Sequence, residues 1–560
     1  MAVSNVIILV TFFASLPFWV VILTSFNYYY DYAATKFSPG DTGEVYDFIV
    51  VGGGSAGSVV VNRLSRNNKV LLIEAGGDPI YLHRIPGIAP NLLHRPQVDW
   101  MHKTVPQKNA LLGHVDNVSR WPRGKILGGS SNLNYMLYVR SHPRSSDYHG
   151  DFYSEKHYGS TGYGPLHVES KKWNPLKDYF LEGGKEMGFP TVDLNGPQKS
   201  GFCPLEVTQK NGERYGTYTA FIKPILDRKN LRIAKYSHAT KIKLDNNNRA
   251  VGVWYLQHGV KKFARVSKEV IVSGGTIDSA KLLLLSGIGP KAELKKIGIK
   301  PRVDLPVGKN LNDHVAVLML NILVDSGSLV SYMPERDFGI QTFTDYFFQG
   351  KGPLSTPLGI VNHAFFSSSE VRKTGIDWPD VQVFASVVGN YENIAADFAA
   401  TYGFKKELLD KFLGPNLGND GIIFFPTLGR PLSLGEITLR DKDPLSPPVI
   451  DPHYLEHPQD VKALVEGMQF VAKLLQTKIS DKRTVVDSKL RVLKTVGLRV
   501  ADNSIQPALV NANTNAPAIM IGEKAADTIR DFWFQQYEVC DRTERLKYGR
   551  ENKCFYLRLA

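Results

Sequence analysis

Cysteine is scarce in this chain. Only Cys203, Cys540 and Cys554 occur among 560 residues. So few cysteines exclude a disulfide framework and a thiolate metal cluster, and we predict no metal site. Cys540 and Cys554 share the C-terminal tail, where they either pair in an oxidising compartment or stay as free thiols; the sequence leaves both open.

A nucleic-acid-binding motif is also lacking, although the formal net charge is +13. Lysines and arginines are scattered along the chain instead of accompanying a recognisable module, so nucleic acid is not a predicted partner. A solvated basic surface, which also suits an anionic dinucleotide, explains the charge. With 43% hydrophobic and 22% charged residues, the composition is that of a folded enzyme of about two to four domains.

Charged residues are absent from the N-terminal stretch that precedes Asp31. Residues 6–26 form an apolar run of about the length that crosses a bilayer, and Trp19 and the cluster at 28–30 resemble interfacial anchors. A basic region typical of a signal peptide is missing, since the first lysine is Lys36. Residues 1–44 are therefore predicted to be a membrane anchor, or a cleaved signal segment, with a linker. Either alternative predicts the secretory route.

A glycine-rich motif stands between two apolar stretches at residues 47–76, where strand, turn, helix and strand follow one another. Gly52 permits the tight turn, Gly54 lets the backbone approach a pyrophosphate, and Gly57 allows close packing of helix against strand. The N-terminus of the helix supplies free N–H groups and a positive dipole end for phosphates. This pattern predicts a bound adenine dinucleotide.

Glu74 ends the second strand of this motif. A carboxylate at that position accepts hydrogen bonds from both ribose hydroxyls and disfavours a 2′-phosphate. The sequence therefore favours a dinucleotide whose adenosine ribose carries free hydroxyls.

Further strands and helices follow along the chain. A hairpin is predicted from 231–244 and 250–257, and a strand at 268–273 leads into a Gly-Gly turn and a helix at 278–286. The remaining predicted elements are strands at 354–366, 380–388 and 435–439 and helices at 393–413, 461–475 and 516–532.

Two long signatures then identify a family. Residues 124–140 read GKILGGSSNLNYMLYVR and residues 275–289 read GTIDSAKLLLLSGIG. With the glycine motif, they make the chain resemble the glucose-methanol-choline (GMC) oxidoreductase family, especially its invertebrate glucose-dehydrogenase-like members, over about 46–533. Ser141 and Ala280 depart from the residues usual in these signatures.

The resemblance implies an α/β fold, with a discontinuous FAD-binding doubly wound domain and a substrate domain built on an antiparallel sheet. We expect the main part of the FAD-binding domain at 45–314 and the substrate domain at 315–484. A return to the FAD-binding domain is expected at 485–533, followed by a basic tail at 534–560.

The cofactor contacts implied for FAD gather in the first signature. Gly128 lets backbone N–H groups approach the cofactor, and Ser130 and Asn134 can bond its polar atoms. By resemblance, Leu127 and Asn134 lie near the flavin. Ala239 stands where the family meets the adenine, and Asp502 where it meets the ribityl chain and pyrophosphate.

The implied activity is oxidation of a CH–OH group of an alcohol or sugar by hydride transfer to flavin N5, with a quinone or O₂ as acceptor. The family places a base histidine in a segment that is missing here between 476 and 484, and the last histidine of the chain is His457. A second catalytic position is kept as Asn513, whose amide cannot take a proton. As substitute base we favour His363 over His314, because its strand is expected to face the cavity.

A second segment is missing between 150 and 162, directly before the Gly-Pro-Leu motif that begins at Gly164. The two losses fit omitted exons or a splice form as well as an evolved change. An alternative function is thus a homologue that binds FAD but is catalytically impaired. A chain that cannot fold is the third alternative.

Overall fold

The computed structural model describes residues 16–36, 44–139, 146–150, 164–193, 195–196, 199–318, 320–324 and 331–477. Asp502, Asn513, Cys540, Cys554 and the predicted segments 485–533 and 534–560 lie outside the described residues.

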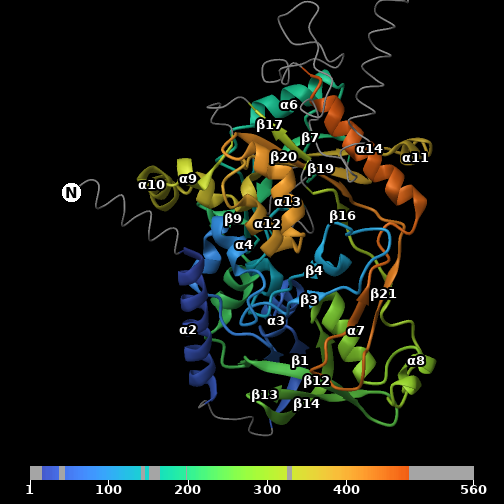
Figure 1. The fold of residues 1–560 in the computed structure, drawn as a ribbon. Coiled ribbons are helices and arrows are strands. Elements are labelled where there is room, and N and C mark those ends of the chain that lie inside the picture. Colours follow the sequence, from blue (N-terminus) through green and yellow to red (C-terminus); the bar gives the residue numbers. More distant parts are fainter. Residues whose placement is uncertain are drawn as a thin grey trace, which may run out of the picture.

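A six-stranded sheet forms the lower half of the molecule in Figure 1, in the order β11-β2-β1-β14-β13-β12. The strands β11, β2, β1 and β14 run parallel to one another, whereas β13 pairs antiparallel with both β14 and β12. Their bounds are β1 Val45–Val51, β2 Val70–Ile73, β11 Leu231–Ala234, β12 Ser237–Leu244, β13 Ala250–Gln257 and β14 Val260–Val272.

Both faces of this sheet are apolar, as parallel sheets require. Val50 of β1 packs with Val61 of α3 (Ser55–Leu64) on one face. Its neighbour Ile49 packs with Leu282 of α7 (Gly275–Leu285) on the other. Helices on opposite faces make the domain doubly wound and confirm the α/β fold class.

A second sheet lies above, in the order β16-β20-β19-β18-β7, with β17 also paired to β20; every pairing is antiparallel. Its strands are β7 Gly201–Pro204, β16 Val315–Ala316, β17 Leu320–Leu323, β18 Ile360–Phe366, β19 Val381–Ser386 and β20 Gly421–Leu428. The edge strand β7 comes from within the stretch 45–314, so this part of the chain contributes to both sheets.

Alternation along β20 separates the two faces of the second sheet. Phe424 packs with Phe470 of α14 (Pro458–Leu474), on the face that also carries α6 (Lys177–Glu186). Phe425 belongs to the cluster formed by α12 (Ile394–Tyr402) and α13 (Lys406–Leu413). The shorter strands of the described residues are β3 His102–Lys103, β4 Arg120–Trp121, β5 Ser146–His149, β6 Leu166–Ser170, β8 Glu206–Val207, β9 Gln209–Lys210, β10 Glu213–Arg214, β15 Lys309–Leu311, β21 Gly435–Thr438 and β22 Val449–Asp451.

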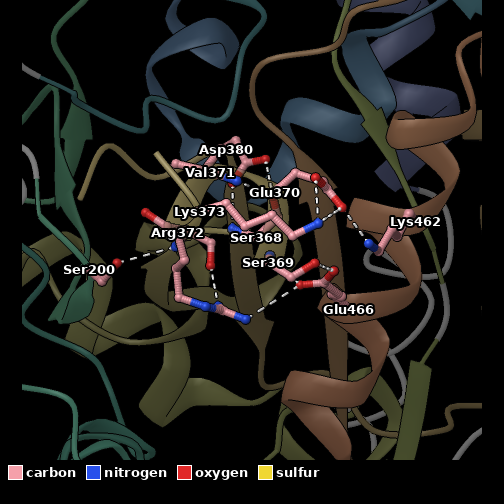
Figure 2. Close-up of polar contacts among 11 residues, drawn as sticks. Ser200, Ser368, Ser369, Glu370, Val371, Arg372, Lys373, Asp380, Lys462 and Glu466 are labelled. Atoms are coloured by element: carbon pink, nitrogen blue, oxygen red, sulfur yellow. Dashed lines mark hydrogen bonds and ion pairs between the residues drawn. The ribbon is translucent and has the colours of Figure 1, made fainter. Parts of the chain in front are cut away.

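A polar network fastens α14 to α11 (Ser369–Arg372), as Figure 2 shows. The Ser369 amide donates to Glu466 at 2.7 Å, and the Ser369 hydroxyl donates to the same carboxylate. Lys462 pairs with Glu370 one turn away. This network holds the last described helix to the loop between β18 and β19.

Helix α2 (Leu16–Lys36) lies along the first domain, at the left of Figure 1. Asp31 accepts from Lys235 and from the Tyr236 hydroxyl, each at 2.6 Å, and Tyr28 meets the Tyr236 ring edge-on at 5.3 Å between centroids. Among the residues that the structure describes, no helix has both the length and the apolar character needed to cross a membrane. The first part of the predicted run 6–26 lies outside those residues.

Proline and glycine account for the main differences from the predicted elements. The strand predicted from 354 begins only at Ile360, because Pro353 and Pro357 open the short 3₁₀ turns η8 (Pro353–Ser355) and η9 (Pro357–Gly359). The helix predicted at 393–413 is two helices, since Gly403 adopts φ +86° between them. The antiparallel pairing of the predicted hairpin is confirmed for β12 and β13, but its first arm was predicted too long, because Leu231–Ala234 forms β11, which pairs parallel with β2 at the opposite edge of the sheet.

Candidate active site

The glycine turn after β1 needs its glycines for steric reasons. Gly52 has φ +95°, and a Cβ there would lie 2.5 Å from the carbonyl oxygen of Ser273. A Cβ on Gly57 would collide with the carbonyl oxygen of Gly52. Helix α3 therefore sits directly against the turn, as the motif predicts.

A cavity of about 550 Å³ opens at this turn. Gly54, Ser55 and Ala56, at the N-terminal end of α3, line it, so the positive end of the helix dipole faces the cavity. The N-terminal end of α7, from Gly275 to Ser279, lines it as well. Two helix N-termini directed at one cavity suit a diphosphate.

The loop of the first signature closes the cavity and touches the glycine turn. The Gly128 amide donates to the Gly53 carbonyl at 2.7 Å. A Cβ on Gly129, which has φ +55°, would lie 2.7 Å from the Cα of Gly54. Ser130 lines the cavity, and its hydroxyl accepts from the Gly124 amide at 3.0 Å.

Glu74 is buried at the cavity wall. One carboxylate oxygen accepts from the Gly53 amide at 2.7 Å and the other from the Gly76 amide at 2.8 Å. Burial raises the pKa of Glu74 to about 7, although these two amides act to lower it. Each carboxylate oxygen accepts more than one hydrogen bond, so Glu74 can hold the turn and still receive the ribose hydroxyls.

β12 and the loop before β3 also contribute to the lining of the cavity. Ala239 and His238 line it together with Trp100, whose ring meets the His238 ring edge-on at 5.3 Å between centroids. Burial lowers the pKa of His238 to about 4, with Lys281 adding a smaller effect in the same direction, so the imidazole is neutral at pH 7. An aromatic and neutral lining of this kind suits the adenine.

The structure thus brings Gly52, Gly54, Glu74, Ser130 and Ala239 to one cavity. The other predicted cofactor residues in the described part of the chain are not among the residues that line this cavity. Gly57 and Gly128 serve the packing of the loops, and Leu127 is buried under Gly53. Asn134 lies at the end of the signature loop, where its side-chain oxygen accepts from Arg214 at 2.8 Å.

Trp100, Arg123, His238 and Lys281 also line the cavity, and none of them was predicted from the sequence. Trp100 stands in an irregular segment without a motif. The other three had a signal in their positions, because Arg123 directly precedes the first signature, His238 directly precedes Ala239, and Lys281 lies within the second signature.

His363 is on β18, which lies between β19 and the edge strand β7 of the second sheet, and 3% of it is exposed. Its Nδ1 lies 2.9 Å from Nε2 of Gln382, and its ring stacks on Phe384 with 6.1 Å between centroids. Phe384 packs against the cluster that includes Tyr135 and Leu137, which follow the signature loop. Burial lowers the pKa of His363 to about 3, so its imidazole is neutral.

His314 is exposed, beside Asp313, which accepts from the Tyr454 hydroxyl. The two candidate bases therefore differ in environment, because His314 is exposed to solvent and His363 is buried in the second sheet. Asn513, the other predicted catalytic residue, lies outside the described residues. Among the described residues, no group of three or more histidine, cysteine or acidic side chains is placed to hold a metal ion.

Comparison with known proteins agrees with this geometry. The GMC oxidoreductase N-terminal family model matches residues 46–316. The C-terminal model of the same family matches in two pieces, 431–483 and 478–522, which overlap within the stretch 476–484 where the resemblance predicts that the base-histidine segment is missing.

Individual relatives cover most of the chain. Glucose dehydrogenase [FAD, quinone] from Drosophila pseudoobscura pseudoobscura is 34% identical over 91% of this chain and 91% of its own length. Alcohol dehydrogenase [acceptor] from Pseudomonas putida is 33% identical over 87% and 96%. Among solved structures, a variant of formate oxidase from Aspergillus oryzae superposes with a TM-score of 0.65 at 25% identity, covering 88% of this chain and 99% of that one.

Proposed function

This chain belongs to the GMC oxidoreductase family, and from that premise we propose that it oxidises an alcohol or sugar by hydride transfer from a CH–OH carbon to N5 of bound FAD. The chain is an FAD-dependent enzyme that acts on CH–OH donors. One observation carries the assignment of the cofactor site. Two glycine loops meet around a cavity that holds a buried carboxylate and faces two helix N-termini.

The residues present fit the cofactor. Gly54 and Gly129 keep two backbones close where side chains would fill the space. In our proposal, the N-termini of α3 and α7 receive the pyrophosphate and Glu74 receives the ribose hydroxyls. His238, Ala239 and Trp100 would enclose the adenine, while the loop 127–134 carries the flavin contacts and Asp502 contributes from the C-terminal segment.

The alcohol proton needs an acceptor, for which we propose His363, with Asn513 binding the substrate hydroxyl. The neutral imidazole of His363 has one basic lone pair, on Nδ1, which supports this role only once Nε2 of Gln382, the donor at 2.9 Å, has turned away. Burial opposes it, because the imidazolium would form within an apolar sheet. The substitution of His363 described in the Discussion decides between these effects.

The test is anaerobic addition of primary alcohols, polyols and glucose to the FAD-loaded protein, followed by its visible absorption. Bleaching of the oxidised flavin band by at least one of these donors is the expected result. A fully loaded flavin that stays oxidised across the panel would contradict the proposal and favour the impaired homologue. Reoxidation by a soluble quinone under nitrogen, compared with air, then identifies the acceptor; the name of the Drosophila relative supports a quinone.

We also propose that the N-terminal segment directs the chain into the secretory route, as membrane anchor or cleaved signal. The apolar run at 6–26 supports this. Translation with microsomes tests it: protection of the chain from protease is expected, and N-terminal sequencing of the product distinguishes anchor from cleaved signal. Full digestion would contradict the proposal.

A further inference from the structure

A second cavity, of about 310 Å³, shares no lining residue with the first. It lies between η1 (Tyr81–Arg84), the hairpin of β9 (Gln209–Lys210) and β10 (Glu213–Arg214), and α10 (Ile340–Gln349). Its lining residues are Tyr81, Arg84, Lys210, Asn211, Glu213, Arg214, Tyr215, Tyr346 and Phe347. Nothing in the proposed oxidation uses this cavity.

Arg214 is the unusual member of the lining, because it is a guanidinium with only 2% of its surface exposed. Its Nε donates to the His83 carbonyl at 2.8 Å, and Nη1 donates to the Ser131 carbonyl at 2.9 Å and to Asn134 at 2.8 Å. Nη2 is buried and has no hydrogen-bond partner within the described ranges. No carboxylate in those ranges forms an ion pair with Arg214.

A buried cation without a counter-ion is destabilised, because it has lost its hydration and gained no opposite charge. The one acid of the lining does not supply the missing charge, because Glu213 pairs with Arg84 and accepts from the Tyr81 hydroxyl at 3.0 Å. Lys210 adds a further positive charge, which lies 5.9 Å from the centroid of the Tyr215 ring. The cavity therefore has an excess of positive charge, and the unpaired Nη2 of Arg214 lies beneath its wall, with almost no exposed surface.

The walls of the cavity are aromatic. Tyr81, Tyr215, Tyr346 and Phe347 contribute four rings, and Arg84 lies 5.3 Å from the centroid of Tyr81. Aromatic walls favour a flat apolar body, while free N–H donors favour a carboxylate, which guanidinium groups bind well.

We propose that this cavity binds a planar aromatic carboxylate, with its carboxylate on Lys210 and near the uncompensated charge of Arg214, and with its ring among the four aromatic side chains. Arg214 holds Ser131 and Asn134 of the signature loop, so an occupied cavity is coupled to the loop that carries the predicted flavin contacts. The site is separate from the proposed substrate site, and the proposal does not depend on the oxidation described above.

Calorimetric titration of the FAD-loaded protein with benzoate tests the proposal. Benzoate should bind at least about 10-fold more tightly than the neutral benzamide, because a charge-assisted hydrogen bond is lost with benzamide. Cyclohexanecarboxylate, which has the charge without the flat ring, should bind more weakly than benzoate. Titration without detectable benzoate binding, or with equal affinity for benzamide, would overturn the proposal.

Variants locate the binding. Arg214→Gln should weaken benzoate by about 10-fold or more, and Lys210→Gln by about 3-fold, whereas the exposed Lys229→Gln should leave it unchanged. Phe347→Ala, which lies on α10 and away from the signature loop, keeps the proposal testable if Arg214→Gln does not fold. Benzoate that binds Arg214→Gln, Lys210→Gln and Phe347→Ala like the parent protein, or that is displaced by the alcohol substrate, belongs to another site and overturns the proposal. Flavin that no alcohol bleaches would leave benzoate binding in place, so the two proposals fail separately.

Discussion

The Gly128 amide donates a 2.7 Å hydrogen bond to the carbonyl of Gly53. This bond joins the two sequence motifs that point to the cofactor, one at the end of β1 and the other in the signature loop. Glu74 strengthens the same junction, since it accepts from the amide of Gly53. The cofactor site is therefore one hydrogen-bonded unit made from three separate segments.

Substitution of Gly57 should break this unit. In Gly57→Ala the new methyl group would collide with the carbonyl of Gly52 and push α3 away from the turn. We expect a loss of about 2 kcal/mol or more in the free energy of unfolding, and purified protein with little FAD. Denaturant unfolding and the ratio of visible to ultraviolet absorption measure the two effects.

The matched control is Gly414→Ala. Gly414 has φ −49°, and an added Cβ meets nothing within 4 Å. Its stability and FAD content should match those of the parent protein. Normal FAD loading in Gly57→Ala would contradict the steric argument.

The stability of the protein without FAD should depend on pH through the protonation of Glu74. Its pKa is raised from 4.5 to about 7 in the folded state, so the folded chain holds a proton that the unfolded chain has lost between these values. Stability from this group is complete below pH 4.5 and falls as the pH rises towards about 7. The midpoint of thermal unfolding, measured at a series of pH values without FAD, should therefore drop more steeply for the parent protein than for Glu74→Gln.

FAD itself gives the second readout for Glu74. The glutamine amide can accept through one oxygen only, so the bonds from Gly53 and Gly76 cannot both persist. FAD affinity should fall by about 10-fold or more in Glu74→Gln. Equal pH slopes and equal FAD affinities in the two proteins would refute the role given to this carboxylate.

His363→Gln tests the proposed proton acceptor. If His363 takes the alcohol proton, kcat should fall by about 100-fold or more while FAD loading stays normal. The comparison variant is His314→Gln, at an exposed position, for which we expect little change. A large loss of kcat with His314→Gln alone would assign the base to His314, and a loss of stability without a loss of kcat would make His363 a structural residue.

The network in Figure 2 should contribute to the stability of the second domain. Glu466→Ala leaves the Ser369 amide and hydroxyl without their acceptor, and we expect a loss of about 1–2 kcal/mol in the free energy of unfolding. Glu407→Ala, at an exposed position on α13, should stay within about 0.5 kcal/mol of the parent protein. Urea unfolding followed by circular dichroism distinguishes the two, and equal midpoints would show that the network adds nothing.

The local parts of the site could be predicted from the sequence, whereas its long-range parts could not. Gly52, Gly54 and Glu74 follow from a motif whose spacing matches one strand–turn–helix–strand unit. Trp100 and His238 meet because a loop and an edge strand fold onto the same cavity, and no periodicity encodes that contact. The edge strand β7 likewise joins the second sheet through β18, its partner more than a hundred residues later in the chain.

The strand β18 and the helices α12 and α13 were predicted as longer, uninterrupted elements. The hydrophobic pattern alone does not show where a proline or glycine ends a strand or helix. Pro357 delays β18, and Gly403 divides α12 from α13. The burial of Arg214 was not predicted from the sequence either. Arginine in a hairpin is usually exposed, and here segments distant in the sequence cover it.

The contacts of α2 have a practical consequence for anyone who produces this protein. Asp31 reaches Tyr236, and both side chains stand against Gly77, whose carbonyl accepts from the amide of Leu127. A recombinant version trimmed to start at Val45 would leave Lys235 with Asp78 as its sole acidic neighbour in the described ranges. Such trimming exposes the Tyr236 ring, and only Gly77 separates that ring from Leu127 of the signature loop. A low FAD content in the shortened protein would therefore be an effect of the truncation.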